Sequence, residues 1–147
     1  MSNVFVDTNV LAYSVDRHDR AKQARARQIL QSLAQDHQPV ISTQVLQEFY
    51  AATTVKLKQE PLLAKNSLHD FSHLETVQID VELIEQGIDI GIISRISFWD
   101  GLIIAAAERA KCPTIFSEDL KSGQAIRGVS VVNPFIAPLE KVLKTTG

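Results

Sequence analysis

The sequence is short of several features that mark particular classes of protein. It has one cysteine, Cys112, so it forms no internal disulfide and is not a disulfide-stabilised secreted domain. Its longest apolar run, Leu102–Ala107, covers six residues, whereas a transmembrane helix needs roughly 20. The opening segment, MSNVFVDTNV, lacks the basic start of a signal peptide and carries Asp7. We therefore expect a cytoplasmic protein with no membrane segment.

Neither sign of charge dominates the chain. Its 147 residues include 15 Lys and Arg against 17 Asp and Glu, a formal net charge of −2. Proteins that coat nucleic acids are usually basic, so this balance argues against that class. It does not argue against a nuclease whose acidic residues hold a metal ion. Hydrophobic residues make up 45% and charged residues 22%, which excludes a wholly disordered chain.

No linker rich in Gly, Pro or Ser, no repeat and no low-complexity tract interrupts the chain. We therefore predict a single domain over residues 1–147, with a core at about 3–135 and a C-terminal tail at about 136–147. Folding at this length hides about two-thirds of the surface that the unfolded chain exposes, which is enough for a hydrophobic core.

Short β-branched segments alternate with segments of helical periodicity. The predicted strands are 3–6, 39–41, 77–79, 114–116 and 129–132. The predicted helices are 19–35, Ser42 or Thr43 to about 58, 61–73, 80–94 and 97–110. Strands that alternate with helices favour a mainly parallel sheet with helices on both faces, which is an α/β fold.

Four carboxylates are expected to gather at one edge of this sheet. Asp7 directly follows the first predicted strand, and Asp119 follows the fourth. Glu48 lies in the helix after the second strand, and Asp100 lies in the first turn of the helix that begins near Ser97. Ligands of open parallel sheets bind at the carboxyl ends of the strands. Because like charges in a partly buried site repel one another, a divalent cation is expected there, and oxygen ligands suit Mg²⁺ or, as a substitute, Mn²⁺.

Each of these acids also has a purely structural explanation. Asp7 suits the N-cap of a short helix at 10–15, and Ser97 and Asp100 have the spacing of a capping box. Glu48 fits a solvated helix face, and Asp119 fits a turn. Their joint placement, at strand ends or in adjoining helices of one fold, favours a shared site.

Five segments of the chain resemble the PIN-domain family and, within it, the VapC-type toxins of bacterial toxin–antitoxin pairs. They are VDTNVL at 6–11, QEF at 47–49, SFWD at 97–100, SEDL at 117–120 and GVSVVNPF at 128–135. The resemblance implies a PIN-like three-layer α/β/α sandwich with a central, mainly parallel sheet. By position, the catalytic and metal-binding acids of a Mg²⁺-dependent ribonuclease would be Asp7, Glu48, Asp100 and Asp119. Asn9 and Ser117 match the polar supporting positions.

Such a site would hydrolyse an RNA phosphodiester with a metal-activated water. Asp7 and Asp100 are the first choice as metal ligands, and Asp119 and Glu48 would complete the set or bind a second ion. Asn9 is expected to orient Asp7 or a metal water, and Ser117 to hydrogen-bond a water or a phosphate oxygen. A metal-activated water does not use the ribose 2′-hydroxyl, so the expected products carry a 5′-phosphate and a 3′-hydroxyl.

The resemblance also implies a homodimer and a small antitoxin protein whose Arg or Lys enters the acidic groove. Without the four acids, 13 acidic residues stand against 15 basic ones, so the remaining surface is not acidic. Candidate contacts to RNA phosphates are Arg17, Arg20, Arg25 and Arg27. The alternative for these arginines is a solvated helix face or pairing with an acidic partner. The isoleucine-rich helix at 80–94 suits either an exposed interface or burial on two sides.

Two other functions stay open. A haloacid-dehalogenase-type phosphatase also has an Asp after its first strand, but it needs a second Asp two residues later, where this chain has Asn9. A non-catalytic RNA-binding module is the other alternative. His69 and His73 have the spacing of a zinc-protease motif, but they fall on the solvated face of their helix with no third ligand. Trp99 is expected to pack in the core.

Overall fold

One six-stranded sheet organises the structure, a computed structural model that describes residues 2–136 and 138–144. The strands are β1 (Asn3–Val6), β2 (Gln38–Ser42), β3 (Glu75–Val77), β4 (Thr114–Phe116), β5 (Ala125–Ile126) and β6 (Val129–Val132). Their order across the sheet is β3-β2-β1-β4-β6-β5. Neighbouring strands pair in parallel except β5 and β6, which are antiparallel.

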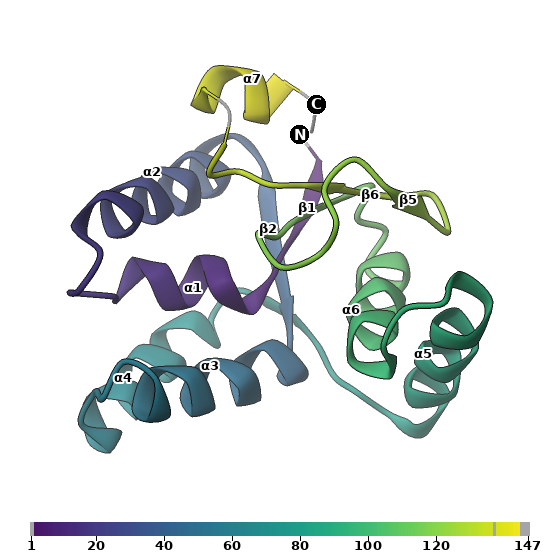
Figure 1. The fold of residues 1–147 in the computed structure, drawn as a ribbon, viewed down its shortest axis with the longest axis horizontal. Helices are drawn as coiled ribbons and strands as arrows, with labels where there is room; N and C mark the ends of the chain where they lie inside the picture. Colours follow the sequence, from purple (N-terminus) through teal and green to yellow (C-terminus); the bar gives the residue numbers. More distant parts are fainter. Residues whose placement is uncertain (1, 137, 145–147) are drawn as a thin grey trace.

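Helices cover both faces of this sheet (Figure 1). On one side stand α1 (Thr8–Ser14), α2 (Arg20–Asp36), α3 (Thr43–Val55) and α4 (Pro61–Phe71). On the other stand α5 (Val81–Ser94) and α6 (Phe98–Arg109), and α7 (Leu139–Lys144) follows the last strand. The predicted three-layer α/β/α arrangement with a mainly parallel sheet is confirmed.

Short polar side chains begin the helices where the sequence predicts. Asp19, Ser42 and Asp80 each accept a hydrogen bond from a backbone N–H in the first turn of α2, α3 and α5. These bonds satisfy N–H groups that have no partner inside the helix. Pro61 occupies the first turn of α4, where its missing N–H costs nothing.

The core lies between the sheet and the two helical layers. Strand β1 buries Val4, Phe5 and Val6 completely. Helix α6 buries seven consecutive residues, Gly101–Ala107, as expected for a helix enclosed in a core. Among the described residues no single helix is long and apolar enough to cross a membrane. Helices α5 and α6 meet the length and apolarity criteria only when taken together, and they are bent by 116° relative to each other.

The strand predicted at 77–79 lies two residues earlier, at Glu75–Val77. Its register is set by β2, which places Glu75 opposite Val40 and Val77 opposite Ser42. Ile79 lies beyond the strand, and its N–H donates to Thr43 Oγ1 at 3.2 Å. Pairing with the neighbouring strand therefore outweighs the local apolar pattern.

Two elements were not predicted, and the short helix considered at 10–15 is α1, which begins earlier, at Thr8. Strand β5 has two residues, too few for a periodic pattern, and it forms by pairing with β6. Helix α7 falls in the region predicted as a C-terminal tail, and its Val142 is buried. Residues 137 and 145–147 of that tail lie outside the described residues.

Trp99 and two isoleucines of α5 are more exposed than a core position allows. The prediction that Trp99 packs in the core is wrong, since its side chain is 62% exposed in the first turn of α6, ahead of the buried stretch. On α5, Ile92 and Ile93 are 71% and 75% exposed, whereas Ile90 is buried. Burial of α5 on two sides is therefore excluded. Ile88 and Ile92 help to line a shallow pocket of about 380 Å³.

Candidate active site

Asp7 and Ser117 stand at the carboxyl ends of the adjacent strands β1 and β4. The backbone ladder continues through both, because Asp7 N–H donates to Phe116 O and Ser117 N–H donates to Val132 O, each at 3.0 Å. Ser117 Oγ donates to Asp7 Oδ2 at 2.7 Å. Both side chains are buried. The sheet thus holds this pair rigidly at its edge, as the strand-end positions predict.

Asn9 lies at the centre of the polar atoms on this edge. Its Oδ1 accepts a hydrogen bond from Glu118 N–H at 3.0 Å, so its amide nitrogen is turned toward the acids. Nδ2 lies 3.2 Å from Asp119 Oδ2 and 3.5 Å from Asp7 Oδ2. It also lies 3.3 Å from Ser117 Oγ. Asn9 therefore joins Asp7 and Asp119, which come from opposite ends of the chain.

The loop after β4 brings Asp119 to the same place. Ser117 Oγ accepts hydrogen bonds from the N–H groups of Asp119 at 3.2 Å and Leu120 at 3.1 Å. Leu120 is buried, which anchors the far side of the loop, while Asp119 itself is exposed. The hydroxyl of Ser117 therefore both holds Asp7 and shapes the turn that carries Asp119.

The other two acids come from α6 and α3. Asp100 lies in the first turn of α6, where its N–H donates to Ser97 Oγ at 3.1 Å. Glu48 projects from α3 one turn after Gln44, whose side chain lowers the pKa of Glu48. Gln44 Nε2 also donates to the carbonyl oxygen of Trp99 at 3.1 Å. Gln44 therefore ties α3, the helix that carries Glu48, to the start of α6, a role that the sequence did not indicate.

Burial raises the pKa of Asp7 above its ordinary value of 3.8. Hydrogen bonds from Ser117 and Thr8 act in the opposite direction, and the charges of Asp119 and Asp100 add to the rise. The protein thus stabilises the charged form of the Asp7 carboxylate poorly.

The pKa of Glu48 is also raised, first by burial of its carboxyl group and then by the charge of Asp7. The hydrogen bond from Gln44 lowers it, and the charges of Asp100 and Asp119 raise it further. The charges of Asp100 and Asp119 therefore reach both Asp7 and Glu48. The structure brings these four acids to one edge of the sheet, and their catalytic roles stay predictions.

A groove of about 640 Å³ opens beside the acids, and residues of α1 and α3 supply most of its lining. Its polar lining includes Asn9, Glu48 and Asp119, together with Asp16 and one cation, Lys56. Its apolar lining residues are Ala12, Ala51, Ala52, Val55 and Leu57. Thr8 also lines the groove, and its buried Oγ1 has no hydrogen-bond partner within the part of the chain that the structure describes. This hydroxyl is a polar group beside the acids that the sequence analysis missed.

The arginines expected to contact RNA have different surroundings. Arg25 Nε donates to Pro134 O at 3.0 Å, and Arg27 Nε donates to Ser14 O at 2.8 Å. These two side chains tie α2 to the segment after β6 and to α1, respectively. Arg17 and Arg20 are exposed. A role in RNA binding remains a prediction for all four.

The two histidines at 69 and 73 contact each other on the exposed side of α4. Their rings meet edge to face at 5.1 Å, and His73 Nδ1 lies 3.0 Å from the carbonyl oxygen of His69. Their surroundings are those of a solvated helix face.

The donor atoms of the acidic site fit a hydrated Mg²⁺ ion. Across residues 2–136 and 138–144, no three His, Cys, Asp or Glu side chains form a ready-made metal centre. The site offers carboxylate oxygens and hydroxyl groups, which are hard ligands, together with the unpartnered Oγ1 of Thr8. Mg²⁺ usually keeps several of its waters, so carboxylates can hold it without meeting at one point.

The fold is an α/β/α sandwich with a mainly parallel sheet, and its acidic side chains gather at the carboxyl ends of the strands. The chain belongs to the PIN-domain family, whose model matches residues 4–124. The matched span contains all four acids. Nucleases of this family generally depend on a divalent metal.

Solved structures with the same fold include toxins of toxin–antitoxin pairs. VapBC2 from Rickettsia felis, bound to a DNA fragment from its promoter, is 19% identical over 88% of this chain and 96% of that one, with a TM-score of 0.64. A toxin–antitoxin complex from Klebsiella pneumoniae is 21% identical over 89% and 97%, with a TM-score of 0.65. The Mycobacterium tuberculosis toxin VapC20, which cleaves the sarcin–ricin loop, is 18% identical over 79% and 89%, with a TM-score of 0.63. Comparison with curated protein sequences gave no significant match.

Proposed function

We propose that this protein is a Mg²⁺-dependent endoribonuclease and the toxin of a toxin–antitoxin pair. The observation that carries the proposal is the gathering of acids at the strand ends of a PIN domain, where Asn9 joins Asp7 to Asp119. The charges of Asp100 and Asp119 act on both Asp7 and Glu48. The similarity to VapC20, a toxin that cleaves RNA, supports the ribonuclease assignment. Mn²⁺ is expected to substitute for Mg²⁺, since both prefer oxygen ligands.

The residues of the site divide into ligands and supports. Asp7 and Asp100 would hold the ion directly or through water, with Asp119 and Glu48 completing the set or holding a second ion. When bound, the ion supplies charge neutralisation at the phosphate and an acidified water. Ser117 donates to Asp7 and so directs its oxygens. Asn9 keeps Asp7 and Asp119 together through its amide group.

The alternatives are less well supported. A haloacid-dehalogenase-type phosphatase requires an acid at position 9, and the amide of Asn9 is engaged as a hydrogen-bond donor to the acids. A non-catalytic RNA-binding module would not need a cluster of acids whose charges raise the pKa of Asp7 and Glu48. Membership of the PIN family favours phosphodiester hydrolysis over both.

We propose that the groove between α1 and α3 receives a segment of a small antitoxin protein. Its apolar lining suits apolar side chains, and its acidic part suits an Arg or Lys. A cation placed there pairs with the carboxylates and competes with the metal ion. The Klebsiella complex and the Rickettsia VapBC2 complex support an antitoxin as the partner. The cytoplasmic location stays a prediction from the sequence.

We also propose that the protein is a homodimer. The support for it is the exposed apolar surface of α5, with Ile88, Ile92 and Ile93. Soluble monomers rarely leave a contiguous apolar surface open to water.

The proposed activity is tested by cleavage of generic RNA with Mg²⁺, with Mn²⁺ and with EDTA. We expect Asp7→Asn and Asp100→Asn each to lower the cleavage rate by a factor on the order of 100 or more, because a neutral amide holds the ion poorly. Asp70→Asn, the same change on the exposed face of α4, is the matched control and should retain full activity. Circular dichroism confirms that each variant is folded.

The products distinguish the mechanism. End-group analysis should find a 5′-phosphate and a 3′-hydroxyl. A 2′,3′-cyclic phosphate would contradict the metal-activated water, and full activity of both site variants would refute the site. Hydrolysis of a small phosphomonoester without RNA cleavage would favour the phosphatase, and RNA binding without cleavage would favour the non-catalytic module.

A further inference from the structure

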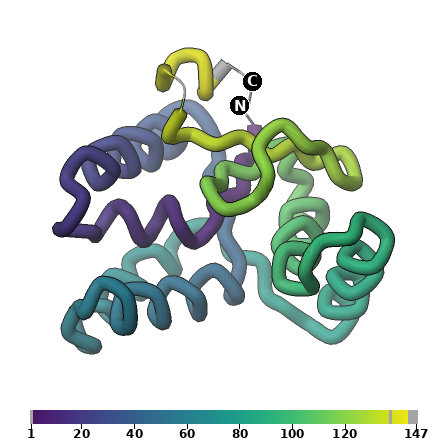
Figure 2. Tube along the Cα trace, viewed as in Figure 1, coloured from purple at the N-terminus to yellow at the C-terminus, as the bar shows by residue number. Residues whose placement is uncertain are grey.

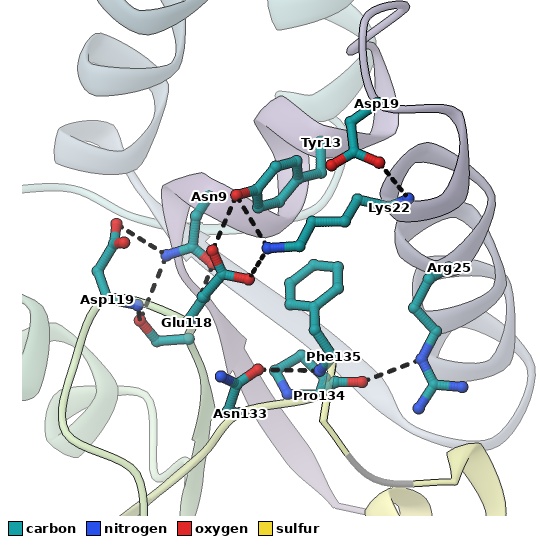
Figure 3. A network of polar contacts seen from close by, with 11 residues as sticks. Asn9, Tyr13, Asp19, Lys22, Arg25, Glu118, Asp119, Asn133, Pro134 and Phe135 are labelled. Carbon is teal, nitrogen blue, oxygen red and sulfur yellow. Dashed lines mark hydrogen bonds and ion pairs between the residues drawn. The ribbon is translucent and has the colours of Figure 1, made fainter.

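A fifth carboxylate, Glu118, directly precedes Asp119 but turns away from the acidic site. Figure 3 shows its side chain pointing toward Tyr13 and Lys22, while Asp119 lies on the other side of Asn9. Tyr13 belongs to α1 and Lys22 to α2. The loop after β4 is therefore fastened to both helices through one side chain.

Glu118 has a partner for each of its carboxylate oxygens. The hydroxyl of Tyr13 donates to Oε1 at 2.8 Å, and the ammonium group of Lys22 forms an ion pair with Oε2. Lys22 Nζ also lies 3.1 Å from the Tyr13 hydroxyl oxygen and 4.5 Å from the centre of its ring. The three groups thus form a closed triangle of polar contacts.

The segment after β6 covers this triangle. The rings of Phe135 and Tyr13 meet edge to face with their centres 5.1 Å apart. Lys22 Nζ lies 5.3 Å from the centre of the Phe135 ring. Arg25 Nε holds Pro134 O at 3.0 Å, which keeps Phe135 in place. The chain trace in Figure 2 shows this segment returning alongside α2. The side chains of Lys22 and Glu118 are 33% and 25% exposed, so their ion pair is shielded in part from water.

The triangle connects to the acidic site through the backbone of the same residue. Glu118 N–H donates to Asn9 Oδ1 at 3.0 Å, and this bond turns the amide nitrogen of Asn9 toward Asp7 and Asp119. The position of Glu118 therefore sets both the loop that carries Asp119 and the orientation of Asn9.

We propose that Lys22 and Tyr13 hold Glu118 as a positioning residue, which fixes the loop of Asp119 and keeps a fifth negative charge compensated beside the metal-binding acids. The inference rests on the proposed function in that the acids hold a divalent cation. It adds the ion pair of Lys22 and Glu118, which lies outside the four acids and controls the net charge beside them and the position of Asp119.

Opposite effects follow for the two partners of the ion pair. Removing the charge of Lys22 leaves an uncompensated negative charge beside the acids, which attracts a divalent cation more strongly. Removing the charge of Glu118 leaves an uncompensated positive charge, which repels the cation. Removing both restores neutrality but leaves the loop unfastened. A side chain that only packs would not produce effects of opposite sign.

The experiment measures Mn²⁺ binding directly by calorimetry on the full chain. We expect Lys22→Met to tighten Mn²⁺ binding and Glu118→Gln to weaken it, each by about three- to tenfold, as screened charges near a divalent ion should. The double variant should return to within about twofold of the wild-type affinity. Lys22→Arg keeps the charge and should bind Mn²⁺ like the wild type. Lys65→Met, on the exposed face of α4, is the matched control for loss of a lysine.

Cleavage kinetics test the positioning role. We expect the double variant, in spite of its wild-type Mn²⁺ affinity, to have a kcat about tenfold lower with an unchanged KM for RNA, because the loop of Asp119 is no longer fastened. Tyr13→Phe removes one hydroxyl and no charge, so it serves as a milder variant if the others unfold. It should lower kcat and leave Mn²⁺ affinity unchanged.

The outcomes separate this inference from the proposed function. Shifts of Mn²⁺ affinity in the same direction for both single variants, or no shift, overturn the inference while leaving the nuclease assignment intact. Mn²⁺ binding by the wild type without RNA cleavage overturns the proposed function. In that case the Mn²⁺ affinities of the Lys22 and Glu118 variants, measured by calorimetry, still test the inference. Absence of Mn²⁺ binding by the wild type overturns both.

Discussion

The position of Asp7 suits both of the roles that the sequence presented as alternatives. Its Oδ1 accepts a hydrogen bond from Thr8 N–H at 2.8 Å as the N-cap of α1, while Oδ2 faces Ser117 and Asn9. The structural and the functional interpretation are therefore both compatible with one carboxylate. The cap fixes one oxygen and so directs the other into the acidic site. Ser97 likewise caps α6 through the N–H of Asp100, without excluding a role for the Asp100 carboxylate.

The raised pKa of Asp7 predicts how the stability of the metal-free protein depends on pH. The folded state holds the proton of Asp7 more tightly than the unfolded chain, so stability falls as pH rises from about 3.8 through the raised pKa. Without a divalent ion at pH 7, we expect Asp7→Asn to raise the Tm by about 2–4 °C, the shift that about 1 kcal/mol gives at this chain length. The advantage should shrink toward acid pH.

Thermal unfolding with and without saturating Mg²⁺ checks this prediction. Bound metal should raise the Tm of the wild type by mass action and leave the Tm of Asp7→Asn almost unchanged. The difference between the two Tm values should therefore become smaller or change sign. A lower Tm for the variant at pH 7 without metal would show that the hydrogen bonds of Asp7 outweigh the cost of burying its charge and the repulsion from Asp119 and Asp100.

At the scale of elements, α6 places Asp100 through its contact with α5. A Cβ atom added to Gly101, the residue after Asp100, would lie 2.4 Å from the carbonyl oxygen of Gly87 and 3.0 Å from Gly91 N. The backbones of the two helices therefore touch at this point, and only glycine fits. The position of the first turn of α6 follows from this close approach.

Gly101→Ala is expected to force α5 and α6 apart. The atom that it meets is backbone, so we expect a loss of about 1–3 kcal/mol in the free energy of unfolding, together with lower cleavage activity as Asp100 is displaced. Gly91→Ala is the graded control, because its nearest neighbour, Ile96 O, is 3.2 Å away and alanine favours a helix. Denaturant unfolding measures both, and equal stability of Gly101→Ala and the wild type would contradict the close packing.

At the scale of the whole molecule, a monomer would leave the apolar side chains on the outer side of α5 exposed to water, which is unfavourable. Ile92 and Ile93 are more than two-thirds exposed, at 71% and 75%, on a helix whose other side packs against α6. Burying these side chains against a second copy would remove apolar surface from water on both partners.

Light scattering at micromolar concentrations should therefore give the mass of a dimer. We expect Ile92→Asp or Ile93→Asp to produce a folded monomer, because each places a charge in the interface. Ile136→Asp, an equally exposed position (74%) outside α5, should remain dimeric. A monomeric wild type at high micromolar concentration would contradict the dimer.

Much of the architecture could be read from local sequence. Helix starts at Asp19, Ser42 and Asp80 were predicted because an N-cap depends on a side chain and the N–H groups two or three residues on. The alternation of strands and helices likewise follows from short-range periodicity and predicts the parallel sheet. From that sheet, the strand-end positions of Asp7 and Asp119 follow without any knowledge of side-chain contacts.

What the tertiary structure alone decided are the contacts between distant residues. Asn9 meets Asp119 and Lys22 meets Glu118 across 110 and 96 positions of the chain, and no local pattern records such pairs. The same holds for Gln44, which joins α3 to the carbonyl oxygen of Trp99, and for the edge strand β3, whose register is set by β2. Local propensities determine which elements form, whereas packing between them determines which side chains share a site, because that packing depends on the whole chain at once.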